Sequence, residues 1–166
     1  TNLSFLAFSS NDEFSSCNPA NIPGYDPASY SVNLLNFGDS NNPIGSCVGT
    51  CCDLSALDAS DLNPGVTLKG GNFTGATLAY ANLTGMDLSG TNFSYANLTG
   101  INLSGCTLNG TIFTGANLSG ADLSGVNAPN AIFTSASLYS ADLTRSNFSN
   151  ADFTGAGFGG ADIDGS

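Results

Sequence analysis

The chain has 166 residues, 13 acidic and 2 basic side chains and no histidine, which gives a formal net charge of −11 at pH 7. With only Lys69 and Arg145 basic, the sequence excludes binding to nucleic-acid phosphates or to anionic lipid through a basic patch. No run of about 18 apolar residues occurs, so no segment is predicted to span a membrane. The lack of histidine removes the commonest general base and the commonest transition-metal ligand.

Residues 1–58 are predicted to form an irregular N-terminal segment. Aromatic and leucine side chains are frequent in it, but four prolines interrupt regular structure. A short helix is expected near Ala28–Phe37, and the remainder is expected to be loop.

Four of the five cysteines lie in this segment, at Cys17, Cys47, Cys51 and Cys52. In a loop-rich segment they predict two disulfides, for which three pairings exist. We expect the adjacent Cys51 and Cys52 to bond outward, one each to Cys17 and Cys47, rather than to each other. A zinc site is the alternative, but Cys-x₃-Cys-Cys without histidine is poor spacing for it. Disulfides imply an exported, oxidising compartment, and a chain that starts at Thr1 fits a product after signal-peptide cleavage.

A repeat of five residues occupies the rest of the chain, 59–166. From Leu68 to Ile163 every fifth residue is Leu, Phe or Ile, except Ala128. A small residue stands two positions earlier, Asn or Asp lies between, and Ser or Thr and then often Gly follow. A period of five fits neither a helix nor an ordinary strand. It fits a three-residue extended segment and a two-residue corner, with the small residue and the Leu or Phe pointing inward.

The phenylalanines indicate how many sides each coil has. They recur every twenty residues, so four pentapeptides are predicted per coil, which gives a square solenoid of about five coils and about 24 Å in length. Ala128 and the oversized Phe148 share one interior column, as volume compensation requires. The opening coil near Asp53–Leu62 is expected to be irregular and slipped by one residue. Residues 1–58 are expected to cap it. The phenylalanine column consists of Phe73, Phe93, Phe113, Phe133 and Phe153.

Segments such as Ala81-Asn82-Leu83-Thr84-Gly85 and Ala121-Asp122-Leu123-Ser124-Gly125 resemble the pentapeptide-repeat family. The resemblance implies an all-β fold, a right-handed quadrilateral β-helix. It also implies a role that is seldom enzymatic, since the family hosts many functions. Its best-known activity is mimicry of DNA towards a topoisomerase, and some members are lumenal or periplasmic proteins of photosynthetic organisms.

No catalytic, cofactor-binding or metal site is predicted. The many serines and threonines have no base to activate them. Asp122, Asp142 and Asp162 form an outward ladder whose oxygens would suit calcium, but this position is usually Asn or Asp in the repeat, so a structural role is preferred. Paired carboxylates on a flat wet face also lack the cleft that glycoside hydrolysis needs. Cys106 takes an inward position and is expected to be a buried structural thiol.

Tyr80 and Tyr95 replace Gly at corners, and Tyr139 replaces Ser or Thr on a face. Exposed tyrosines are suitable contact residues. Together with the aspartate ladder they predict a non-enzymatic, exported protein that presents flat β-helix faces to a protein partner. The resemblance suggests a lumenal subunit of a photosynthetic membrane complex, peripheral to a thylakoid membrane and without a membrane span.

Two alternative functions remain open. The acidic charge favours a DNA mimic, but the charge is divided: residues 1–58 hold six acids and no base, and residues 59–166 hold seven acids and two bases. An ice-binding solenoid would use a flat, weakly charged face with a ladder of hydroxyls. Such a ladder is formed by Thr74, Ser94, Thr114, Thr134 and Thr154.

Overall fold

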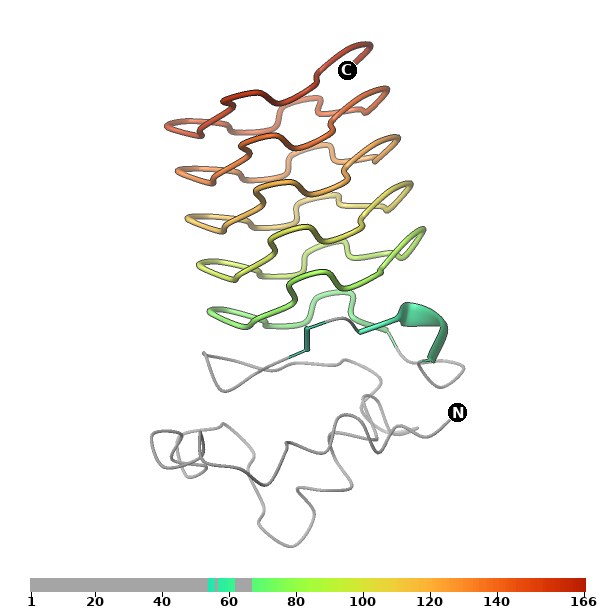
Figure 1. The fold of residues 1–166 in the computed structure, drawn as a ribbon. Coiled ribbons are helices and arrows are strands. Elements are labelled where there is room, and N and C mark those ends of the chain that lie inside the picture. The colour runs from blue at the N-terminus through green and yellow to red at the C-terminus, as the bar shows by residue number, and fades with distance from the viewer. Residues whose placement is uncertain (1–53, 56, 62–66) are drawn as a thin grey trace, which may run out of the picture.

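The computed structural model describes residues 54, 55, 57–61 and 67–166 (Figure 1). Within them the chain is a right-handed quadrilateral β-helix, a stack of square coils that ends at the C-terminus. Most of the predicted N-terminal cap, the expected helix at Ala28–Phe37 and the four cysteines predicted to form disulfides lie outside the described residues.

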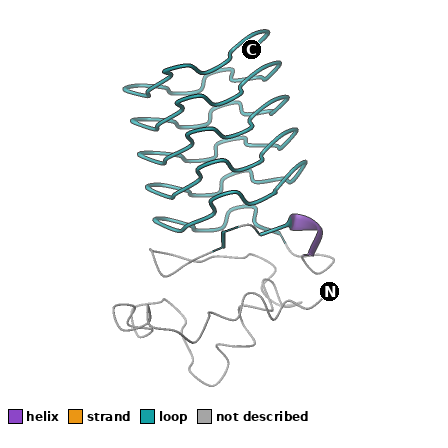
Figure 2. Cartoon of the chain, viewed as in Figure 1, coloured by secondary structure: helices purple, strands orange, loops and turns teal. Residues whose placement is uncertain are grey.

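Pairing between coils confirms that four pentapeptides make one coil. The outward residue in the middle of an extended segment, which is usually polar, pairs in parallel with the residue twenty positions later, as in Asn72↔Asn92 and Asp142↔Asp162. Each pairing involves a single residue because a corner follows at once. Within the described residues, the backbone therefore forms isolated bridges and turns, and its one helix is the 3₁₀ helix η4 (Ala59–Asp61) (Figure 2).

The coils and faces are defined here by residue number. Coil 1 is described from residue 67, and coils 2 to 5 start at residues 86, 106, 126 and 146. Each face is named by the inward residues at its centre. Face 1 has Leu68, Leu88, Leu108, Ala128 and Phe148; face 2 has Phe73, Phe93, Phe113, Phe133 and Phe153; face 3 has Leu78, Leu98, Leu118, Leu138 and Phe158; face 4 has Leu83, Leu103, Leu123, Leu143 and Ile163.

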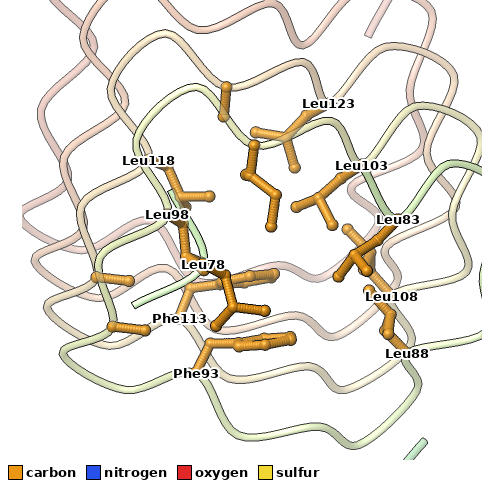
Figure 3. Packing of buried hydrophobic residues seen from close by; sticks show 14 of the residues in the cluster. Leu78, Leu83, Leu88, Phe93, Leu98, Leu103, Leu108, Phe113, Leu118 and Leu123 are labelled. Atoms are coloured by element: carbon orange, nitrogen blue, oxygen red, sulfur yellow. The ribbon is translucent and has the colours of Figure 1, made fainter. Parts of the chain in front are cut away.

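The inward columns fill the interior of the rod. On face 2, the rings of Phe73 and Phe93 stack at 5.4 Å between centroids, and those of Phe133 and Phe153 at 4.7 Å. Leucines of faces 3 and 4 form the neighbouring columns (Figure 3). Burial of these side chains supplies the main favourable free energy of folding.

The predicted volume compensation is confirmed at Ala128. Ala128 is fully buried, and Phe148, one coil later in the same column, packs its ring against Phe133 with centroids 5.8 Å apart and nearly perpendicular planes. Phe148 also meets Phe153 edge to face, at 5.4 Å. A leucine at 128 would compete with this ring for space in a core that tolerates little overpacking.

The corners have one backbone conformation throughout. At each corner the residue before the next pentapeptide has a positive φ, between 54° and 72°, from Gly70 to Gly165. The N–H that follows donates to the inward residue three positions earlier, as from Ala81 to the Leu78 carbonyl at 3.1 Å. This is the geometry of a type II turn, whose third residue favours glycine. Glycine is replaced here at Tyr80, Tyr95, Asn130, Ser135, Ser140, Arg145 and Asn150.

The opening coil is irregular, as predicted. Asp58 pairs with Asn82, which lies 24 residues later instead of twenty. The shift arises between Ala59, where η4 begins, and Leu68. Nine positions separate these two residues, four more than the five of the regular repeat. Four extra residues move a five-residue repeat by one position, which is why the sequence shows a slip of one.

Polar side chains that point inward find a partner 23 residues earlier in the chain. The hydroxyls of Thr91, Thr111 and Ser146 donate to turn carbonyls at 2.8, 2.9 and 2.8 Å. Cys106 is buried as predicted, and its Sγ donates to the Leu83 carbonyl at 3.0 Å. Burial raises the pKa of this thiol to about 11. Cys106 therefore stays protonated and behaves as a small core residue.

The C-terminal end of the stack is open. Phe158 and Ile163 of coil 5 are 38% and 57% exposed, whereas their counterparts in coils 2 to 4 are buried. They border a pocket of about 440 Å³ that reaches Leu143 and Phe153. No helix among the described residues is long and apolar enough to cross a membrane.

Candidate interaction surfaces

The predicted aspartate ladder lies on face 4. Asp122 pairs with Asp142, and Asp142 with Asp162, so the three side chains occupy successive rungs. Each carboxylate accepts the backbone N–H two residues later, at 2.9 Å for Asp122, 2.8 Å for Asp142 and 3.1 Å for Asp162. These bonds hold the carboxylates at the surface in one repeated orientation.

Face 4 carries most of the charge of the described residues. Asp58 and Asp164 join the ladder, and Arg145 at the adjoining corner is the one cation on this face of the described rod. The pKa of Asp142 is lowered, first by the Thr144 N–H, then by the Thr144 hydroxyl and by the positive charge of Arg145. These interactions favour the ionised form of Asp142.

The ladder has no metal-binding geometry. Within the described residues, no group of three or more His, Cys, Asp or Glu side chains is placed to hold a metal ion. Carboxylates on successive rungs extend side by side along a flat face instead of converging on one point, which is what an oxygen-ligated cation requires.

The predicted tyrosines border face 3. Tyr80 stands at the corner between faces 3 and 4 in coil 1, and Tyr95 at the corner between faces 2 and 3 in coil 2. Tyr139 lies on face 3 itself in coil 4. Their side chains are 70%, 69% and 56% exposed. The predicted contact residues therefore divide between two neighbouring faces, which meet at the corner of Tyr80.

Each tyrosine ring lies against the glycine that occupies the same position one coil later. A Cβ at Gly100 would come within 2.6 Å of the Tyr80 ring, and one at Gly115 within 2.7 Å of the Tyr95 ring. The ring of Tyr139 covers Gly159 in the same way. The sequence analysis missed this pairing, although the twenty-residue spacing of tyrosine and glycine carries the signal.

Face 3 is otherwise a network of amides and hydroxyls. Asn117 Nδ2 donates to Thr99 Oγ1 at 3.0 Å, and Thr99 Oγ1 donates to Asn97 Oδ1 at 2.8 Å. The hydroxyl oxygens of Ser119 and Ser137 are hydrogen-bonded at 2.8 Å. No charged residue occurs on this face in any of the five coils, at 76–80, 96–100, 116–120, 136–140 and 156–160.

The hydroxyl ladder lies on face 2. Its backbone neighbours pair coil to coil from Asn72 to Asp152, so the hydroxyls are also in register. The hydroxyls of Thr74 and Ser94 donate to the side chains of Asn72 and Asn92 at 2.7 and 2.6 Å. In coils 1 and 2 these hydroxyls are therefore engaged with the protein.

Face 1 holds the one ion pair among the described residues. Lys69 Nζ donates to Asp87 Oδ2 at 2.7 Å, and both side chains are about half exposed. The Lys69 ammonium, followed by hydrogen bonds from the Ser89 hydroxyl and N–H, lowers the pKa of Asp87 to about 2. This pair neutralises face 1 and leaves most of the net acidic charge of the described residues on face 4.

Comparison with known proteins agrees with this geometry. The family model for pentapeptide repeats matches in 8 copies, over residues 65–94, 72–110, 91–127 and 131–166. No curated protein matches the chain.

Solved structures similar to the chain include one cyanobacterial and one plant protein. HetL, a pentapeptide repeat protein involved in heterocyst differentiation regulation from the cyanobacterium Nostoc sp. strain PCC 7120, is 28% identical over 71% of this chain and 57% of its own, with a TM-score of 0.42. A pentapeptide repeat protein from the Arabidopsis thaliana thylakoid lumen is 32% identical over 54% of this chain and 63% of its own, with a TM-score of 0.37.

A third similar structure is QnrB1, a plasmid-mediated fluoroquinolone resistance protein, which is 19% identical over 71% of this chain and 72% of its own, with a TM-score of 0.35. Because all three TM-scores are below 0.5, the assignment rests on the family model and on the coil geometry. By both criteria, this chain belongs to the pentapeptide-repeat family.

Proposed function

We propose that the chain is a non-enzymatic interaction protein that presents flat faces of its β-helix to a protein partner. The observation that carries this proposal is the unequal distribution of charge over a rigid rod. Face 4 displays a row of oriented carboxylates from Asp122 to Asp162, and the neighbouring face 3 displays tyrosines without any charge. The rod thus offers two chemically different surfaces on one scaffold.

The size of a face indicates how a protein partner would bind. Five coils at about 4.8 Å and three extended residues give a face of about 24 Å by 10 Å, well below the roughly 800 Å² that each partner buries in a standard interface. A protein partner therefore has to cover more than one face. The corner between faces 3 and 4 meets this need, because Tyr139 on face 3 and Asp142 on face 4 lie on either side of it in coil 4.

The partner's chemistry follows from face 4. Carboxylates in register favour a partner surface with lysine or arginine side chains, and their attraction is screened by salt. We assign Asp122, Asp142 and Asp162 to this contact, with Tyr80, Tyr95 and Tyr139 supplying apolar area at its border.

The proposal places the protein in an exported, oxidising compartment, such as a thylakoid lumen, where it would be a peripheral subunit of a larger membrane complex. Its support is the set of four cysteines at 17, 47, 51 and 52. Intact mass after alkylation, with and without reduction, tests this placement. Two disulfides with Cys106 free support it, and five free thiols contradict it. Denaturant is required during alkylation, because Cys106 is buried.

Crosslinking in the native compartment tests the protein contact. We expect the chain to crosslink to a larger assembly, and Asp122→Asn, Asp142→Asn and Asp162→Asn together to weaken that crosslink at least several-fold. Asp87→Asn and Asp152→Asn, on faces 1 and 2, are the matched controls. A chain that migrates as a free monomer and crosslinks to nothing contradicts the proposal. DNA mimicry would instead appear as inhibition in a supercoiling assay, and ice binding as faceted ice crystals.

A further inference from the structure

We infer that face 3 is a binding surface for a neutral polysaccharide. The inference goes beyond the protein contact proposed above, since it assigns a second class of ligand to face 3 and to the three tyrosines that the protein contact uses only at its border. Three features carry it: the absence of charge on face 3, three exposed tyrosine rings that lie on face 3 or at its two corners and rest against glycines, and two hydrogen-bonded groups of amide and hydroxyl side chains.

The distribution of charge restricts what can bind here. The chain has a net charge of −11, yet face 3 has no charged residue in five coils. An anionic polymer is repelled by the carboxylates of face 4, and a cationic surface is drawn to face 4 instead. An uncharged ligand can bind face 3 without the free-energy cost of desolvating a charged group.

The tyrosines supply apolar contact without closing a pocket. The faces of a tyrosine ring carry partial negative charge, so they attract the C–H groups that line one side of a pyranose. Tyr80 and Tyr95 lie against Gly100 and Gly115, so little side-chain freedom remains to be lost on binding. Tyr139 is three coils beyond Tyr80, about 14 Å along the rod axis. This spacing suits a ligand that extends along the rod.

The polar side chains of face 3 match the hydroxyls of a sugar. Asn97, Thr99 and Asn117 are linked by hydrogen bonds of 2.8 and 3.0 Å, and Ser119 and Ser137 by one of 2.8 Å. Amides and hydroxyls both donate and accept, as sugar hydroxyls do. The network holds these groups in place before binding, which reduces the cost of ordering them.

The shape of the surface selects a polymer. The pocket described above lies at the C-terminal end, and face 3 is a flat array of rungs. Small ligands are usually bound in concave pockets that bury most of their surface. A flat face about 10 Å wide instead suits a single extended chain that makes several shallow contacts.

Affinity electrophoresis of the full chain tests the inference. Native gels would contain hydroxyethylcellulose, xyloglucan, laminarin or galactomannan as neutral probes, and polygalacturonate or alginate as anionic ones. We expect at least one neutral polymer to retard the protein and the anionic polymers to leave its mobility unchanged. The high negative charge of the chain makes it mobile without a carrier.

The matched variants restore the residues that the repeat uses elsewhere. Tyr80→Gly and Tyr95→Gly place glycine at corners with φ near 60°, and Tyr139→Ser restores the usual hydroxyl, so folding is preserved. We expect each change to weaken binding about tenfold, which is the loss of one moderate contact. Tyr80→Phe and Tyr139→Phe retain the ring and are expected to retain most of the affinity. Asp122→Asn and Asp142→Asn on face 4 should leave retardation unchanged.

Each result has a defined meaning. Absence of retardation by every neutral polymer, or equal retardation of the wild type and the tyrosine variants, overturns the inference. A change of oligomeric state in the tyrosine variants would also overturn it, because face 3 would then be a contact between copies of this chain. Loss of the protein crosslink in the aspartate variants, with polysaccharide binding intact, separates the two proposals.

Discussion

The inner coils and the last coil carry the same repeat but bury it to different extents. Leu103 in coil 2 and Ile163 in coil 5 occupy the same inward column of face 4, yet Leu103 is fully buried and Ile163 is 57% exposed. The difference arises because an inward side chain of an inner coil is covered by the coils on both sides. An inward side chain of coil 5 is covered by coil 4 on one side only. In a solenoid, the contribution of a repeat depends on its neighbours as much as on its own sequence.

Backbone geometry does not show the same contrast. The corner at Gly165 has a φ of 71°, like that at Gly75, and Leu143 N–H still donates to the Asp162 carbonyl at 2.7 Å. Coil 5 is therefore aligned by coil 4 below it even where its side chains remain exposed. A coil needs one adjacent coil to align its backbone, but it needs an adjacent coil on each side to bury its inward side chains.

The largest expected effect is at the core. Leu103→Ala should lower the free energy of unfolding by about 2–5 kcal/mol, since it leaves a cavity between two coils. Ile163→Ala, in the same column, should cost well under half as much, because Ile163 is largely exposed. Urea denaturation of both variants measures the two values. Equal losses would show that coil 5 is covered in solution.

A smaller effect is expected at the corners. The Cβ that Gly120→Ala adds would have no atom within 4 Å. The expected loss of about 1 kcal/mol in the free energy of unfolding therefore comes from the positive φ of 69° alone. Gly160→Ala places alanine in the same backbone conformation in coil 5. An end coil can open locally, so we expect a smaller loss of unfolding free energy there. The same urea titrations compare the two. A larger loss at Gly160 would contradict this view of coil 5.

Buried hydroxyls should contribute less than a core leucine. Thr111→Val keeps the shape of the side chain but removes the bond to the Leu88 carbonyl, and we expect a loss of about 0.5–1.5 kcal/mol. Thr154→Val, exposed in coil 5, is the control and should be close to neutral. A neutral Thr111→Val would mean that the bond from Thr91 N–H, at 3.0 Å, satisfies the Leu88 carbonyl by itself.

The smallest effect concerns pH. Because the pKa of Asp87 is lowered to about 2 in the folded chain, ionised Asp87 stabilises the fold above pH 4, and this stabilisation is lost as the pH falls towards 2. Both partners are exposed, so the contribution is small. Asp87→Asn should reduce the difference in unfolding free energy between pH 7 and pH 2.5. An unchanged difference would show that the ion pair contributes nothing measurable.

Much of the rod was predictable from spacing. The twenty-residue recurrence of phenylalanine predicted the number of sides, and the small Ala128 beside Phe148 predicted which coils compensate for volume. The slip before Leu68 was predicted, but not that four extra residues around η4 cause it. The sequence also predicted that the aspartates and tyrosines lie at the surface, but the prediction did not assign them to different faces. That assignment requires the position of each residue within a coil of four pentapeptides.

The sequence by itself determined the repeat, its inward columns and the outward chemistry of each rung, because a period of five leaves one way to bury the large side chains. Only the tertiary structure decided which tyrosine rests on which glycine, which buried hydroxyl reaches which carbonyl, and which inward residues remain exposed. Those contacts join residues twenty or more positions apart, and they exist only when one coil is stacked on the next. The division between an acidic face 4 and an uncharged face 3 follows instead from the twenty-residue period, because the position of a residue within the coil assigns it to a face.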